Sequence, residues 1–184
     1  MKEKKVKEIM IALSDYATVS EDDTLATAVK TLKNAREDSK YAYKHRSVLV
    51  FDKDQTIVGK VSMRAILQSL EPKYCHLEHP DGKERMGMSR FGFSNEFLNS
   101  LISNLCLWDE SLELLVKHAS DLKIKDIMYT PSNGEYVDEE ASIAEAVHQF
   151  ILGYHQSLLV TKNKKVVGVL RLVDLFDLIY AVLE

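Results

Sequence analysis

Cysteine, long apolar runs and an excess of positive charge are all scarce in this sequence of 184 residues. Its two cysteines, Cys75 and Cys106, are too few for a disulfide framework and suit a reducing compartment, so we expect a cytoplasmic protein. No stretch approaches the ~20 apolar residues of a membrane span, and we expect no membrane insertion. The formal net charge of −4 does not favour nucleic-acid binding, which usually requires a basic face.

Recognisable catalytic motifs are missing as well. The sequence contains no Walker loop, no nucleophile elbow and no HExxH pattern, so we expect no enzymatic activity and no required cofactor. Cys75, His76 and His79 are close together in the sequence, but a metal site needs further ligands and outer hydrogen-bond partners that orient them. We therefore expect no metal site and interpret these residues as part of an ordinary polar loop.

The sequence does contain an ordered internal repeat. The matching blocks are residues 6–10 with 124–128 and 19–29 with 137–147 at a shift of 118, 47–50 with 157–160 at a shift of 110, and 57–59 with 166–168 at a shift of 109. The first copy therefore carries eight extra residues (118 − 110) between its first helix and its next strand. Several matched blocks in one order indicate a duplication.

Each copy has the pattern of a β-α-β-β-α unit. A short β segment ends near Val19 or Val137, and a helix follows in which apolar residues recur at i, i+3, i+4 and i+7. These residues are Leu25, Ala28, Val29 and Leu32 in the first copy, and Ile143, Ala146, Val147 and Phe150 in the second. Two strands and a final helix complete each unit, at 47–51, 57–61 and 63–70, and at 158–160, 166–170 and 172–183. A unit of about sixty residues buries little surface alone, so we expect the two to pack together.

In this order of elements the chain resembles the cystathionine-β-synthase-type (CBS) domain pair, also called a Bateman module. The resemblance rests on the opening (V/I)-K-(E/D)-I-M, the acidic segment and Ala-rich helix after it, and the strand, Val-Gly pair and terminal helix that close each copy. It implies an α+β fold in which two β-α-β-β-α repeats, residues 3–70 and 122–184, pack as a pseudo-twofold pair. It also implies a regulatory module that often binds adenosine-containing ligands in clefts between the repeats and commonly forms homodimers.

The segment between the copies, residues 71–121, is expected to be a loop and helical insert. Glu71–Gly92 is rich in proline and glycine and predicts mostly loop, whereas Ser94–Cys106 and Asp109–Ser120 carry apolar stripes at helical spacing. These helices could cover the module, join a dimer interface or present a surface to a protein partner. The basic segment Lys33–Arg46 is either a solvated helix extension and loop or a source of positive charge near a polyphosphate.

The family pattern at the end of each unit is Gly, two residues, Ser or Thr, two residues and Asp, and this chain splits it. A hydroxyl at a helix start favours phosphate, and a carboxylate one turn later can accept hydrogen bonds from ribose hydroxyls. Copy one keeps the hydroxyl as Ser62 but has Ala65 in place of the acid. Copy two keeps the acid as Asp174 but has Arg171 in place of the hydroxyl.

The candidate ligand-binding residues are therefore Asp174, Arg171, Thr130 and Ser62. Thr130 lies in the loop that usually wraps the base in this family, and we associate it with the site of Asp174. Arg171 either binds a phosphate bidentately or is a solvated residue at the helix start, and Asp174 and Ser62 could simply stabilise their helix starts. We expect an adenine nucleotide (AMP, ADP or ATP) rather than NAD or S-adenosylmethionine. The alternative is a structural or partner-binding dimer whose clefts are vestigial.

Overall fold

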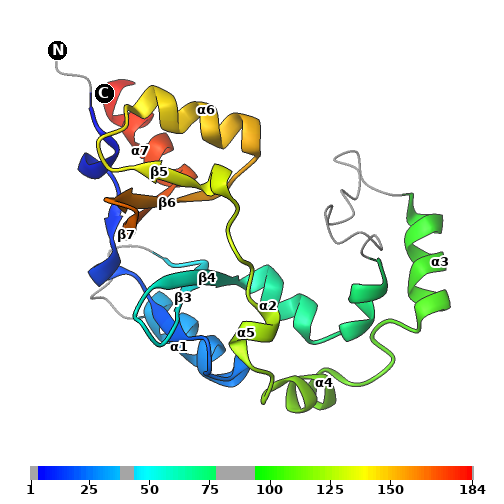
Figure 1. Ribbon diagram of the computed structural model, residues 1–184. Coiled ribbons are helices and arrows are strands. Elements are labelled where there is room, and N and C mark those ends of the chain that lie inside the picture. The colour runs from blue at the N-terminus through cyan, green and yellow to red at the C-terminus, as the bar shows by residue number, and fades with distance from the viewer. Residues whose placement is uncertain (1–3, 38–43, 78–93, 184) are drawn as a thin grey trace.

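The computed structural model describes residues 4–37, 44–77 and 94–183. Its strands are β1 (Ile11–Ala12), β2 (Thr18–Ser20), β3 (Ser47–Phe51), β4 (Ile57–Ser62), β5 (Tyr136–Asp138), β6 (Ser157–Lys162) and β7 (Lys165–Arg171). Its α-helices are α1 (Leu25–Glu37), α2 (Met63–Ser69), α3 (Asn95–Leu105), α4 (Leu112–Ala119), α5 (Ile124–Ile127), α6 (Ile143–Gly153) and α7 (Leu172–Leu183), and its short 3₁₀ helices are η1 (Val6–Glu8), η2 (Leu13–Asp15), η3 (Pro72–Leu77) and η4 (Asn133–Glu135). The expected unit occurs twice, as β2-α1-β3-β4-α2 and β5-α6-β6-β7-α7 (Figure 1), which confirms the α+β fold of two repeats.

Each repeat builds its own sheet. In the first, β2 is parallel to β3 and β3 is antiparallel to β4. In the second, β5, β6 and β7 have the same arrangement, and β1 adds to the far edge of β7, so that the order is β1-β7-β6-β5. Both hairpins carry a register irregularity after the same position of the repeat, Val50 in β3 and Val160 in β6. The two copies therefore share structural detail as well as element order.

The two repeats pack through their sheets, with the helices outside. Side chains alternate between the faces of a strand, and Leu49 of β3 and Leu159 of β6 point into one apolar layer that both sheets share. Leu158 points the other way and packs with Phe150 of α6 and Leu175 of α7. The helices α6 and α7 therefore cover the outer face of the second sheet.

The opening segment of each copy packs on the other copy. The strand β1 pairs antiparallel with β7, and Val6 is fully buried in the core that α6, β6 and α7 form. Conversely, Ile124 of α5 is fully buried in the core of the first repeat. The backbones of Tyr129 and Lys60 on β4 exchange hydrogen bonds of 2.9 and 3.0 Å. This crossing of the opening segments holds the two repeats in contact, and the duplicated sequence alone did not predict it.

The described part of the insert contains two α-helices, α3 and α4, near the expected places. Leu115 and Ala119 of α4 pack with Leu25 of α1 and Leu70 at the end of α2, so α4 joins the first repeat. In Figure 1 the helix α3 (green) stands apart from both sheets. The stretch predicted as loop begins instead with the 3₁₀ helix η3, and most of the remainder, including His79, lies outside the described residues.

Candidate ligand site between the two repeats

Arg171 and Asp174 form an ion pair at the start of α7. The strand β7 ends at Arg171 and leads directly into the helix, so the acid lies three residues later in the first turn. Its carboxylate accepts the Arg171 backbone N–H at 2.8 Å and the side-chain Nε at 3.0 and 3.1 Å, and Nη2 also donates to it. Asp174 is 8% exposed. The acid is therefore satisfied by the arginine that replaced the expected hydroxyl.

A cleft of about 600 Å³ opens beside this helix start, between the repeats. Its lining residues are Tyr16, Lys44, Arg46 and Ser47 from the first repeat and Gln156, Ser157, Arg171, Leu172, Val173, Phe176 and Asp177 from the second. Ser47 and Ser157 are counterparts at the repeat shift of 110, as are Arg46 and Gln156. Equivalent positions of the two copies therefore meet in this cleft, and the pair Arg46 and Gln156 differs in charge.

The cleft concentrates positive charge in a chain whose net charge is negative. Among the described residues, Lys44, Arg46 and Arg171 line it together with one acid, Asp177. Asp174, which pairs with Arg171, is not part of the lining. An excess of one charge sign in a cleft raises the local concentration of an oppositely charged ligand, and a guanidinium binds phosphate or carboxylate groups bidentately. The arrangement suits an anionic ligand of small-molecule size.

Two buried aromatic side chains support the cleft wall. The Tyr16 hydroxyl lies 3.0 Å from Ser47 Oγ, and the Tyr16 ring makes an edge contact with His45 at 4.5 Å between centroids. Burial raises the pKa of Tyr16, although the hydrogen bond with Ser47 acts in the opposite direction. Burial lowers the pKa of His45, and the nearby charge of Arg171 lowers it further. Both side chains are therefore neutral at neutral pH, and the positive charge of the cleft comes from its lysine and arginines.

A smaller cavity of about 260 Å³ lies at the matching place beside α2. Ser62 and Ala65 line it, and Ser62 Oγ accepts the Ala65 backbone N–H at 3.1 Å. This hydroxyl caps α2, and without an acid at position 65 the side chains equivalent to the Arg171–Asp174 pair are missing. The two related cavities therefore differ in size and in chemistry.

Glu135 is a buried acid in the smaller cavity that the sequence analysis missed. It is 2% exposed, and it binds Lys60 Nζ at 2.7 Å, the Tyr129 hydroxyl and the Ser132 backbone N–H at 3.1 Å. Burial raises the pKa of Glu135, but the bonds from Lys60 and Tyr129 outweigh it and hold this pKa below its ordinary value. The Ser132-x-x-Glu135 capping box was a visible signal for the acid. Its partner Lys60 is 75 positions away, in the other repeat.

The fold separates the four candidate residues into two pairs. Arg171 and Asp174 lie beside β1, the opening strand of the first copy, because β1 pairs with β7. The exposed Thr130 follows Tyr129, which pairs with β4 next to Ser62. The expected association of Thr130 with Asp174 is therefore wrong, because each loop after the repeated Met crosses to the other copy's sheet.

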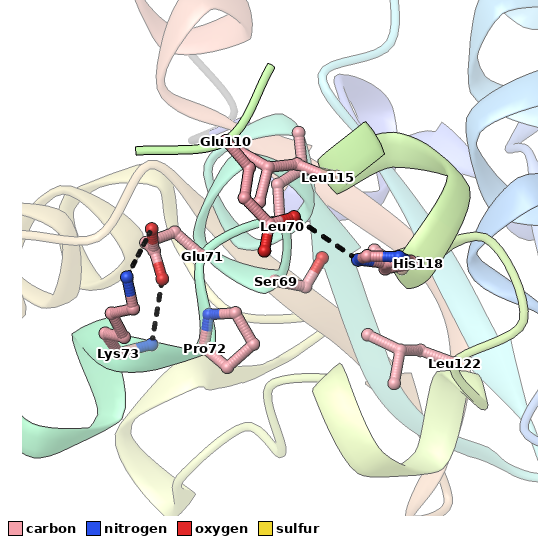
Figure 2. A pocket seen from close by; sticks show the side chains of 10 residues that line it. Ser69, Leu70, Glu71, Pro72, Lys73, Glu110, Leu115, His118 and Leu122 are labelled. Carbon is pink, nitrogen blue, oxygen red and sulfur yellow. Dashed lines mark hydrogen bonds and ion pairs between the residues drawn. The ribbon is translucent and has the colours of Figure 1, made fainter. Parts of the chain in front are cut away.

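A third cavity, of about 390 Å³, lies away from the repeat interface, between the end of α2 and α4. Figure 2 shows Glu71 directed toward Lys73, and Glu110 directed toward His118. The Nδ1 atom of His118 lies 3.4 Å from the carboxylate of Glu110. Leu70 and Leu115 form part of its apolar wall. The buried Glu71 accepts the Trp108 backbone N–H at 2.8 Å. The packing of Leu70 with Leu115 joins the insert to the first repeat, and the contacts of Glu71 and Glu110 hold the insert together.

The described residues contain neither a cluster of metal ligands nor a helix suited to cross a membrane. Within 4–37, 44–77 and 94–183, no group of three His, Cys, Asp or Glu side chains is arranged to hold a metal ion. In the same part of the chain, no helix combines the length and the apolar character that crossing a membrane requires.

Comparison with known proteins agrees with the repeat structure. The family model of the CBS domain matches residues 6–72 and 124–181. A search of curated proteins gives no match. Among solved structures, CBSX2 in complex with AMP has 15% sequence identity and a TM-score of 0.59, over 98% of both chains. The CBS domain of a CBS-domain-containing membrane protein from Sphaerobacter thermophilus has 19% identity and a TM-score of 0.61, over 96% of this chain and 88% of that one. A CBS-domain-containing protein of unknown function from Bacillus anthracis has 17% identity and a TM-score of 0.61, over 97% and 94%.

Proposed function

This chain belongs to the CBS domain family, and we propose that it is a regulatory module that binds one adenine nucleotide in the basic cleft beside α7. The observation that carries the proposal is the gathering of Lys44, Arg46 and Arg171 around a cavity of about 600 Å³ between the repeats. This volume lies within the roughly 300–1,000 Å³ of small-molecule sites. The similar fold of CBSX2, solved with AMP, supports the choice of an adenine nucleotide. The excess of cations in the lining, with Lys44 and Arg46 beside the paired Arg171, favours ADP and ATP over AMP, because the longer phosphate chains carry more negative charge.

The Arg171–Asp174 pair gives both candidate residues a role in this proposal. In the free protein, Asp174 holds the guanidinium of Arg171 at the cleft. A phosphate group competes for that guanidinium, and its shift toward the ligand frees carboxylate oxygens of Asp174. Ribose hydroxyls donate to these oxygens and replace the hydrogen bonds that the buried Asp174 loses from Arg171. The nucleotide thus replaces one ion pair with two sets of charge-assisted contacts.

The smaller cavity is not a nucleotide site in this proposal. It encloses only about 260 Å³, and it has Ala65 where a ribose-binding acid would stand. Ser62 there serves as the cap of α2. Thr130, on the same side of the molecule, does not contact the nucleotide. One chain therefore binds one nucleotide.

Thermal unfolding with AMP, ADP, ATP, NAD and S-adenosylmethionine tests the proposal. A ligand at 100 times its Kd adds ~2.7 kcal/mol of stability, which raises Tm by roughly 5–10 °C for a chain of this length. We expect the largest shifts with ATP and ADP. Arg46→Gln, which installs the residue of the second copy, should reduce the shift to about half or less at the same ligand concentration, and Arg64→Gln in the smaller cavity should preserve it. No shift with any compound at millimolar concentration would contradict the proposal.

A second candidate function is a partner-binding dimer without a ligand. It is favoured by the ion pairs at the two cavities, because the charge of Asp174 is already balanced by Arg171 and that of Glu135 by Lys60. Under this alternative no nucleotide raises the Tm of the wild type or of Arg46→Gln. In both cases we propose that the protein is a homodimer, which helps to regulate a protein partner.

A further inference from the structure

The cavity between the end of α2 and α4 has apolar walls and lies away from the repeat interface. Leu70, Leu115 and Leu122 line it together with Pro72 and Ala119. Its volume of about 390 Å³ is within the roughly 300–1,000 Å³ of small-molecule sites. None of its lining residues also lines the basic cleft or the smaller cavity beside α2. A ligand of this cavity would therefore occupy a separate site.

Glu71, a buried acid in the cavity wall, is already well paired. It is 3% exposed, and it accepts the Trp108 backbone N–H at 2.8 Å and the Lys73 backbone N–H at 3.3 Å. The Lys73 ammonium lies 4.0 Å from the same carboxylate and also donates to the Cys106 carbonyl. These contacts balance the charge of Glu71, and they engage the lysine that an anionic ligand would need.

Glu110, the other acid that lines the cavity, has weaker contacts. Its side chain is 49% exposed. In the part of the chain that the structure describes, its ion-pair partner is His118, and Figure 2 shows the two side chains directed toward one another. Their closest atoms are 3.4 Å apart, which exceeds the ~2.7–2.9 Å of a charge-assisted hydrogen bond. Since a carboxylate has about four acceptor sites, Glu110 can accept further donors from a ligand.

The charge of the surrounding insert favours a cationic ligand. Histidines aside, the described residues 71–77 and 94–121 contain six acids and two lysines. The acids are Glu71, Glu96, Asp109, Glu110, Glu113 and Asp121, and the lysines are Lys73 and Lys117. An excess of one charge sign attracts ions of the opposite sign and repels those of the same sign. This cavity thus has the opposite charge preference to the basic cleft between the repeats.

We propose that this cavity binds a small amphipathic amine. Its ammonium group donates to Glu110, and its apolar body packs on Leu70, Leu115 and Leu122. A neutral ligand of the same shape fills the cavity but lacks the charge-assisted hydrogen bond, and an anion meets two carboxylates. Because Leu70 belongs to the first repeat and Leu115 to the insert, the bound amine strengthens the contact between them.

The binding of hexylamine, hexan-1-ol and hexanoate tests the charge preference. These compounds share one apolar chain, and near neutral pH they are a cation, a neutral molecule and an anion. Titrations that follow the NMR signals of each ligand should give a Kd of about 1 mM for hexylamine. The Kd of hexan-1-ol should be at least ~5-fold higher, because it lacks the contact of the ammonium with Glu110. Hexanoate should bind most weakly, because the acids of the insert repel it.

Matched substitutions of two exposed acids locate the ammonium group. Glu110→Gln keeps the size of the side chain and should raise the hexylamine Kd at least ~5-fold, while it leaves that of hexan-1-ol within ~2-fold. Glu113→Gln is the control, because Glu113 is an exposed acid in the first turn of α4 and does not line the cavity. It should change the hexylamine Kd less than ~2-fold. A thermal unfolding curve checks that each variant is folded.

Equal Kd values for hexylamine and hexan-1-ol, tighter binding of hexanoate, or no binding of hexylamine at about 10 mM would overturn the proposal. So would equal losses in the two variants, which indicate a general attraction to the acidic insert instead of a contact with Glu110. The titrations contain no nucleotide, and the cavity shares no lining residue with the basic cleft. Their result is therefore independent of whether that cleft binds a nucleotide.

Discussion

At the scale of single residues, Arg171 and Asp174 act as a pair. The acid accepts the backbone N–H and the guanidinium of a residue three positions earlier. It therefore closes the first turn of α7, where a negative charge is also favoured by the helix dipole. The same contacts hold Arg171 at the cleft. The arginine that stands in place of the hydroxyl residue of the motif therefore changes the contacts at the start of α7 and also adds a positive charge to the cleft lining.

Glu135 gives a stability prediction at the same scale. Glu135→Gln removes the counter-ion of Lys60, whose side chain is 18% exposed, and should lower the free energy of unfolding by about 1–3 kcal/mol at pH 7. The bonds that hold the pKa of Glu135 down stabilise the fold only while the acid is charged. This contribution is complete above the ordinary glutamate pKa of about 4.3 and is lost as the pH falls through the lower folded-state pKa.

Urea unfolding at a series of pH values measures this effect. The difference between the wild type and Glu135→Gln should shrink below pH ~4.3. Glu140→Gln is the matched control, since Glu140 pairs with Lys7 on the surface and both are more than 40% exposed; it should change stability little at any pH. A wild type and a Glu135→Gln variant that are equally stable at pH 7 would show that the buried pair contributes nothing net.

At the scale of elements, the exchanged opening segments bury a residue of each copy in the core of the other. Val6 is fully buried although it lies near the start of the described chain. Val6→Ala should destabilise the protein by about 1–3 kcal/mol, because it leaves a cavity in the core of the second repeat. Lys7→Ala, at the exposed next position, should have little effect. Urea unfolding compares them, and equal effects would mean that the segment does not contribute to the core.

Most elements were predictable because their signals are local. The recurrence of Leu25, Ala28 and Leu32 predicted α1, and these residues are buried as that pattern requires. Short apolar runs bounded by polar turns predicted the hairpin strands. The partner of β1 was not predictable, because a strand of two residues carries no periodicity that identifies its sheet. Thr130 was therefore associated with the wrong cleft.

At the scale of the whole molecule, the two copies of one unit have diverged in complementary ways. The first repeat supplies Lys44 and Arg46 to the cleft and packs the insert through α4. The second supplies Arg171 and carries an exposed apolar surface on α6 and α7. Leu172, Val173 and Phe176 belong both to the cleft lining and to that surface. The charged cleft and the apolar surface therefore share residues at the start of α7.

Part of the candidate site was also accessible from sequence. The split motif identified Asp174 and Arg171, and their spacing of three at a helix start favours mutual contact. The contribution of Lys44, Arg46 and Tyr16 was not accessible, because these residues approach α7 only when the two sheets pack face to face. The same holds for Lys60 and Glu135, which meet across the repeats.

The most direct test of the central claim, one nucleotide in the basic cleft, is isothermal titration calorimetry with ATP. We expect a stoichiometry of one ATP per chain, and a loss of affinity of at least ~10-fold in Arg46→Gln from one charge-assisted contact. The affinity of Arg64→Gln should equal that of the wild type. Two ATP per chain, or equal affinities in the wild type and Arg46→Gln, would contradict the account.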